Sequence, residues 1–116
     1  MFLAKLLDAY GGRCAITRCS AMEVLEAALV LPYKGEYTNR LDNGLLLRAD
    51  LHTLLDYGLL WVTPKNTAAL APSLLTTDYA VLLEKPLDLP ASSSLRPNRV
   101  HLGEQANACM VRHYRG

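Results

Sequence analysis

The sequence predicts an α+β fold, in which helices flank short β-strands. Apolar residues at helical spacing open the chain at positions 2, 3, 6, 7 and 10, and Gly11-Gly12 ends this pattern. Short apolar runs at 27–31 and 59–62 stop at Pro32 or at turn residues, as buried strands do. With 116 residues the chain has the length of one domain with its own core, and we treat 1–116 as a single domain.

Composition excludes disordered and membrane-spanning classes. Hydrophobic residues make up 51% and charged residues 20% of the chain, which favours an ordered globular domain. No run reaches the roughly 18 to 20 apolar residues that span a bilayer, and the opening FLAKLL is too short for a signal sequence. We therefore expect a soluble domain without a membrane partner.

The cysteines indicate a reducing compartment. Three of them are too few and too odd in number for a secreted disulfide framework, so we expect a cytoplasmic protein. Cys14 and Cys19 lie near zinc-knuckle spacing, but only Cys109 remains for a second pair. Buried thiols are therefore favoured over a structural zinc.

Charge says little about a polyanionic partner, because the formal net charge is only +1. From Arg96 onward the chain has four arginines and two histidines against one acid, Glu104. Such a tail either follows a phosphate backbone or forms a solvated helix face, and charge alone leaves both open.

The remaining elements follow in order. A helical turn is expected within 21–26, a polar loop over 34–42 and a turn at Asn43-Gly44. A helix begins at or near Asp50, buries three leucines and ends at Gly58. A hairpin (59–62 and 67–70), a short helix (77–83), a Pro/Ser-rich loop (86–97) and a final helix to about Tyr114, capped by Asn98, complete the chain.

Four polar residues around the predicted central helix form a candidate metal site. On a helix His52 and Asp56 share a face, because they are four residues apart. Imidazole and carboxylate bind divalent ions that polarise a phosphodiester. Each residue alone has a simpler explanation: His52 as an ordinary helix histidine, Asp56 as a residue that serves the end of its helix, Asp50 as a cap, and Asn43 as a turn residue. Their order and spacing together favour the metal site.

Residues from about Phe2 to Pro90 resemble the HNH endonucleases, also called ββα-metal or His-Me finger nucleases, in a branch associated with restriction and defence. The residues that match are Gly12 to Thr17, Leu25 to Ala28, Pro32-Tyr33, Asn43 to Leu54 and Asp56. The resemblance implies a ββα-metal core over about 12–62, with flanking helices, an additional β-hairpin and a C-terminal helix over about 98–114.

The resemblance also implies residue roles. Asn43 is the central Asn, His52 is the second His and a metal ligand, and Asp56 and Asp50 are further ligands, with Glu26 ranked last. The implied cofactor is a divalent ion, Mg²⁺ or Mn²⁺ first, with Ni²⁺ or Zn²⁺ as alternatives. The partner implied is double-stranded DNA, contacted by Arg48, Lys34 and Arg40.

The chain departs from the family at the first His, where it has Leu29. In the family this His takes a proton from the attacking water, and leucine has no lone pair for that task. The chain is therefore expected to fold and to be able to hold a metal, but to cut DNA poorly or not at all. An engineered substitution and natural decay are both compatible with this, and a single change in an intact motif favours the former.

Another departure is Ala28, where many relatives of the wider family have a further ligand. The alternative to a nuclease is a degenerate, non-catalytic HNH fold that binds DNA or a protein. Fusion to a recognition or sensor domain in a longer protein is expected from the family, and homodimerisation stays open.

Overall fold

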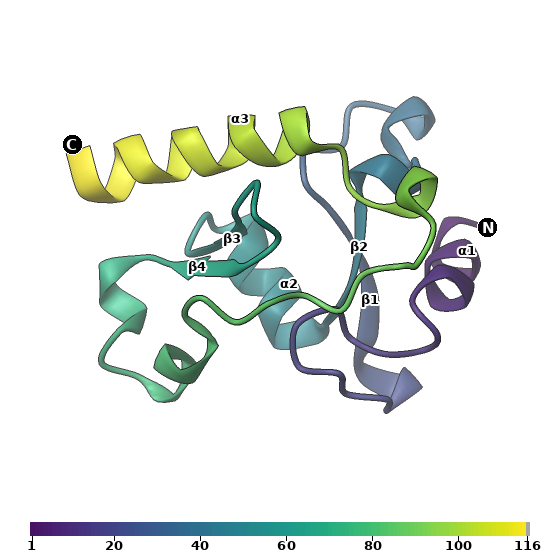
Figure 1. Ribbon diagram of the computed structural model, residues 1–116, viewed down its shortest axis with the longest axis horizontal. Helices are drawn as coiled ribbons and strands as arrows, with labels where there is room; N and C mark the ends of the chain where they lie inside the picture. Colours follow the sequence, from purple (N-terminus) through teal and green to yellow (C-terminus); the bar gives the residue numbers. More distant parts are fainter. Residues whose placement is uncertain (116) are drawn as a thin grey trace.

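The computed structural model describes residues 1–115, in which helices and strands alternate with several short 3₁₀ turns (Figure 1). The chain ends in one π-helical turn, Val111–Arg115. In chain order the elements are α1 (Phe2–Ala9), β1 (Leu25–Leu29), β2 (Gly44–Arg48), α2 (Ala49–Asp56), β3 (Leu60–Val62), β4 (Ala68–Leu70) and α3 (Arg99–Met110). This mixture of helices and small antiparallel sheets confirms the predicted α+β class.

The centre of the molecule is a ββα unit. Strands β1 and β2 pair antiparallel, in a register that sets Leu25 opposite Arg48 and Leu29 opposite Gly44. Helix α2 starts at the residue after β2, with no loop between them, and packs against both strands. Glu26 and Leu29 therefore lie on a paired strand and His52 on the helix that packs against it, so all three residues belong to rigid elements.

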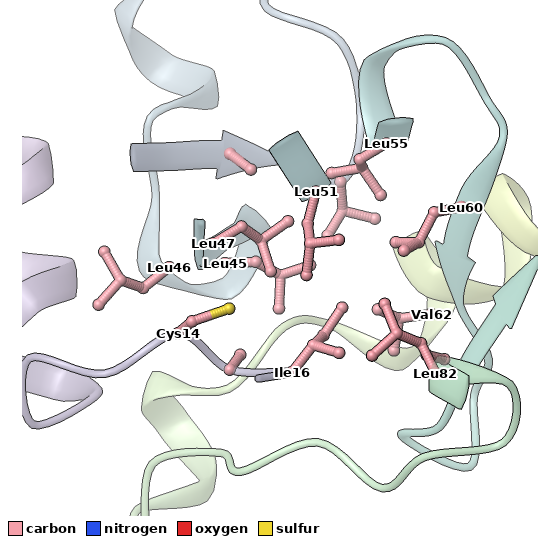
Figure 2. Close-up of a cluster of buried hydrophobic side chains, with 14 of the residues drawn as sticks. Cys14, Ile16, Leu45, Leu46, Leu47, Leu51, Leu55, Leu60, Val62 and Leu82 are labelled. Carbon is pink, nitrogen blue, oxygen red and sulfur yellow. The ribbon is translucent and has the colours of Figure 1, made fainter. Parts of the chain in front are cut away.

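One hydrophobic core joins this unit to its surroundings (Figure 2). Leu45, Leu46 and Leu47 of β2 are all completely buried, because β2 lies between α1 and α2. Burying a leucine side chain stabilises the fold by about 1.5 to 3 kcal/mol. The other labelled members come from α2, β3 and neighbouring loops: Cys14, Ile16, Leu51, Leu55, Leu60, Val62 and Leu82.

The three cysteines differ in their burial. Cys14 and Cys109 are buried and Cys19 is half-buried, and all three are free thiols. The Cys14 sulfur accepts weak hydrogen bonds from the backbone N–H groups of Thr17 and Arg48, at 3.5 and 3.4 Å. Over residues 1–115, no group of three His, Cys, Asp or Glu residues is placed to enclose a metal ion.

Two sequence predictions need correction. The strand expected over 27–31 is β1, two residues earlier, and Val30 continues it only through one hydrogen bond to the carbonyl of Asn43. The expected Asn43-Gly44 turn is absent, since Gly44 has an extended φ of −119° and begins β2. The short helix expected over 77–83 is present as a 3₁₀ helix, Asp78–Leu82.

The C-terminal helix is capped as predicted and closes one side of the molecule. The Asn98 side chain accepts hydrogen bonds from the N–H groups of Val100 and His101. Past α3, Arg112 donates to the carbonyl of Tyr57, and the His113 ring lies parallel to that of Trp61. Part of the basic tail thus anchors the chain end. Within residues 1–115 no helix is long and apolar enough to cross a membrane.

Candidate metal centre

A groove of about 1000 Å³ runs between the end of β1, the C-terminal half of α2 and helix α3. The groove is lined by Leu29 and the residues that follow it, and by Glu104, Gln105 and Ala108 of α3. His52 and Asp56 contribute the polar side chains from α2. The groove therefore joins three of the residues predicted from the sequence, Leu29, His52 and Asp56.

His52 is held from both sides by carboxylates. Its Nδ1 lies 2.7 Å from Oε1 of Glu26 on β1, a hydrogen-bonding distance. Its Nε2 lies 3.3 Å from Oδ2 of Asp56, one helical turn later. The His52 side chain is 25% exposed, whereas Glu26 and Asp56 are 49% and 59% exposed. Solvent and ligands therefore reach the carboxylates more easily than the imidazole.

The spacing of Nε2 and Asp56 fits two neighbouring ligands of one cation. At metal–ligand distances of about 2.1 Å, such ligands are about 3.0 Å apart in an octahedral ion and about 3.4 Å apart in a tetrahedral one. The observed 3.3 Å lies in this range. The site thus offers one imidazole and one carboxylate, which suits an ion that keeps several waters, such as Mg²⁺.

Leu29 supplies no polar atom to the groove. It is half-buried at the end of β1, opposite Gly44, and lines the groove together with His52. A hydrocarbon side chain there neither accepts nor donates a proton. The centre therefore has side chains for a cation and none at position 29 for a general base.

Asn43 fixes the chain that follows Leu29. Its side chain is 3% exposed and makes three hydrogen bonds to backbone. Oδ1 accepts from the N–H of Leu31 at 2.9 Å, and Nδ2 donates to the carbonyls of Leu31 and Thr38 at 3.3 and 3.1 Å. Asn43 therefore holds both ends of the segment 31–38 against the start of β2, and it is not among the residues that line the groove.

Asp50 is placed away from the groove. Its two carboxylate oxygens accept a bidentate pair of hydrogen bonds from Arg48, at 2.7 and 3.0 Å. Oδ2 also accepts from the hydroxyl of Tyr79, at 2.8 Å. The Asp50 pKa is about 2, below its ordinary value of 3.8, mainly because Arg48 donates these hydrogen bonds to the carboxylate. Asp50 therefore links the start of α2 to the 3₁₀ helix at 78–82, and the structure does not bring it to His52.

This pairing predicts an acid limit to stability. Because folding lowers the Asp50 pKa, the contribution of Asp50 is complete above about pH 4 and is lost as the pH falls from about 4 to about 2. We expect urea unfolding to show a smaller stability loss over this interval for Asp50→Asn than for the parent chain. Asp8→Asn, at an exposed position of α1, is the control that should follow the parent. Parallel curves for parent and Asp50→Asn would contradict the assignment.

The predicted DNA-contacting residues differ in availability. Arg48 is paired with Asp50, and Arg40 is paired with Asp42 at 3.0 Å. Lys34 is exposed in the segment after β1 and has no ion-pair partner among the described side chains. A phosphate would meet the full charge of Lys34, but only a partly neutralised Arg40 or Arg48.

Sequence reasoning gave too little weight to two residues. The sequence places Glu26 before the expected strand and ranks it last as a ligand, whereas in the fold it belongs to β1 and contacts His52. Tyr79 has no role in the sequence prediction, because 29 residues separate it from Asp50 and no sequence pattern links them.

Comparison with known families agrees with this geometry. Residues 14–63 match the model of the HNH endonuclease family. This span contains β1, β2, α2 and β3, and with them Leu29, Asn43, His52 and Asp56. No curated protein matches the chain. The match covers less than half of the chain and supports the HNH resemblance; HNH endonucleases act on DNA with divalent metal ions.

Proposed function

We propose that this chain is the nuclease domain of a metal-dependent DNA endonuclease from a restriction or anti-phage defence system, and that it is inactive as written. The observation that carries the proposal is the shared groove. A two-ligand cation site, His52 and Asp56, faces the same space as Leu29, the position of the family's general base. The substrate is double-stranded DNA, and a fused recognition or sensor domain selects the site.

Each residue has a distinct task in phosphodiester hydrolysis. His52 Nε2 and Asp56 would hold the divalent ion, which supplies positive charge to the phosphate and to the leaving oxygen. Asn43 fixes the backbone beyond position 29, and Lys34 meets the DNA backbone. A base at position 29 would remove the proton from the attacking water, and the products would be a 5′-phosphate and a 3′-hydroxyl. Leu29 cannot perform that step.

The cation is Mg²⁺ or Mn²⁺ in this proposal. A site with one carboxylate and one imidazole leaves most coordination positions to water and phosphate, as Mg²⁺ sites commonly do. Ni²⁺ and Zn²⁺ also accept imidazole and are the alternatives. Asp50 is left out of the ligand set, because Arg48 and Tyr79 occupy its oxygens.

Calorimetric titration with Mn²⁺ tests the cation site. We expect the parent chain to bind one ion, and Asp56→Asn and His52→Ala each to weaken binding at least tenfold, since each removes one of two ligands. Asp78→Asn changes an exposed aspartate elsewhere and should bind like the parent. Equal affinity in all four proteins would place the ion elsewhere and contradict the proposal.

The second candidate is a non-catalytic HNH fold that binds DNA or a protein. Leu29 favours this second candidate, because a nuclease that has lost its function would keep the groove and part of the metal site but have an apolar residue in place of the general base. The two readings differ in the effect of an imidazole at position 29. A nuclease centre that lacks only its base regains cleavage, whereas a decayed centre does not.

A further inference from the structure

We propose that Glu26 is a positioning residue, which holds His52 in one tautomer and one orientation so that Nε2 is presented to the cation. This inference rests on the proposed function, because it assigns a role around the same centre. It differs from the ligand role that the sequence left open for Glu26. The geometry of the two carboxylates around His52 carries it.

The contact with Glu26 is a hydrogen bond to a defined ring nitrogen. An ionised carboxylate only accepts hydrogen bonds, so Nδ1 must carry the proton in the 2.7 Å contact with Oε1. In a neutral imidazole, Nε2 then carries the lone pair. Nε2 is the nitrogen that lies beside Asp56, so the hydrogen bond directs the lone pair to the side of the second ligand.

The two distances separate a positioning role from a ligand role. The Glu26 contact, at 2.7 Å, is shorter than the spacing of about 3.0 to 3.4 Å expected for two ligands of one ion. The Asp56 contact, at 3.3 Å, lies within that spacing. At metal sites a carboxylate commonly accepts a hydrogen bond from the ring nitrogen that does not face the cation, and so fixes the orientation of the imidazole.

The scaffold makes this orientation rigid. Glu26 belongs to β1, where it pairs with Leu47, and His52 lies in the first turn and a half of α2, which packs on β1. Ala28, two residues along the same strand face, is buried and offers no polar atom to the ring. Among the described side chains, Glu26 and Asp56 are the two carboxylates that pair with His52.

The tautomer of His52 in the metal-free protein is the first test. Long-range ¹H–¹⁵N spectra of the labelled chain in alkaline buffer distinguish protonated from unprotonated ring nitrogens. We expect the Nδ1–H form in the parent and in Glu26→Gln, whose amide oxygen still accepts the hydrogen bond. Glu26→Ala should shift His52 toward the Nε2–H form, which donates to Asp56. An Nε2–H form in the parent would overturn the inference.

Mn²⁺ affinity of the same proteins is the second test. Removing an orienting carboxylate typically weakens metal binding by 10 to 100 times, and the half-exposed Glu26 points to the lower end, about tenfold, for Glu26→Ala. Glu26→Gln should change the affinity severalfold at most. Glu23→Ala, on the exposed turn before β1, is the control and should have no effect. If Glu26→Gln weakens binding as much as Glu26→Ala, Glu26 is a ligand and the inference is wrong.

The two tests fail in different ways. If neither the parent nor any variant binds Mn²⁺, the proposed metal-dependent function is wrong, and so is the part of this inference that concerns the cation. If Mn²⁺ binds normally but the His52 tautomer does not respond to Glu26→Ala, only the role of Glu26 is wrong.

Discussion

Replacing Asn43 by alanine should destabilise the protein by about 2 to 4 kcal/mol, because three backbone groups lose their partner in a buried position. The affected groups are the N–H and the carbonyl of Leu31 and the carbonyl of Thr38. Urea unfolding at neutral pH measures the change. The backbone after Leu29 is tied to β2 through this side chain, so the loss should also loosen one wall of the groove.

Two further variants sharpen this test. Asn43→Asp keeps the acceptor for Leu31 but loses both donated hydrogen bonds, so it should be destabilised as well. Asn107→Ala removes an exposed amide from α3 and should stay within about 0.5 kcal/mol of the parent. An Asn43→Ala protein as stable as Asn107→Ala would show that segment 31–38 is held by other contacts.

Sequence patterns predicted correctly the elements that depend on contacts between neighbouring residues in the chain. The helical spacing of α1, the turn between β3 and β4 and the Asn98 cap each depend on neighbouring residues, and each is present. The start of β1 was misplaced, because Leu25 and Glu26 join the strand by pairing with Arg48 and Leu47, more than 20 positions later. Pairing of this kind leaves no mark in the sequence near β1.

Asn43 shows what the sequence alone leaves out. Before Gly44 it has the signature of a turn, and the family motif gives it an orienting role. The folded chain adds a contact that neither pattern predicts, because the side chain is enclosed by the segment 31–38 to which it is hydrogen-bonded. The same holds for Asp50, whose partner Tyr79 arrives from a distant 3₁₀ helix.

Replacing Leu29 by histidine should produce plasmid nicking in the presence of Mn²⁺. A positioned general base typically contributes about 10² to 10⁴ in rate, and the rest of the centre is already in place in this account. Leu29 is half-buried at the groove, so an imidazole there reaches solvent without breaking the core. The rate at which supercoiled plasmid becomes nicked measures the gain.

A matched control separates position from chemistry. Leu31 lines the same groove two residues later, and Leu31→His places an imidazole in that space without occupying the position of the base. It should leave the plasmid intact. Nicking by both variants would mean that any groove histidine suffices, and that Leu29 has no special place.

The most direct test of the central claim is the nicking rate of Leu29→His beside that of the double variant Leu29→His/His52→Ala, with the same plasmid and Mn²⁺. The account predicts clear nicking by the single variant and none above the parent's level by the double variant, since the base then lacks its cation. Intact plasmid with Leu29→His, while both Mn²⁺ and DNA are shown to be bound, would contradict the claim that this chain is a nuclease centre lacking only its base.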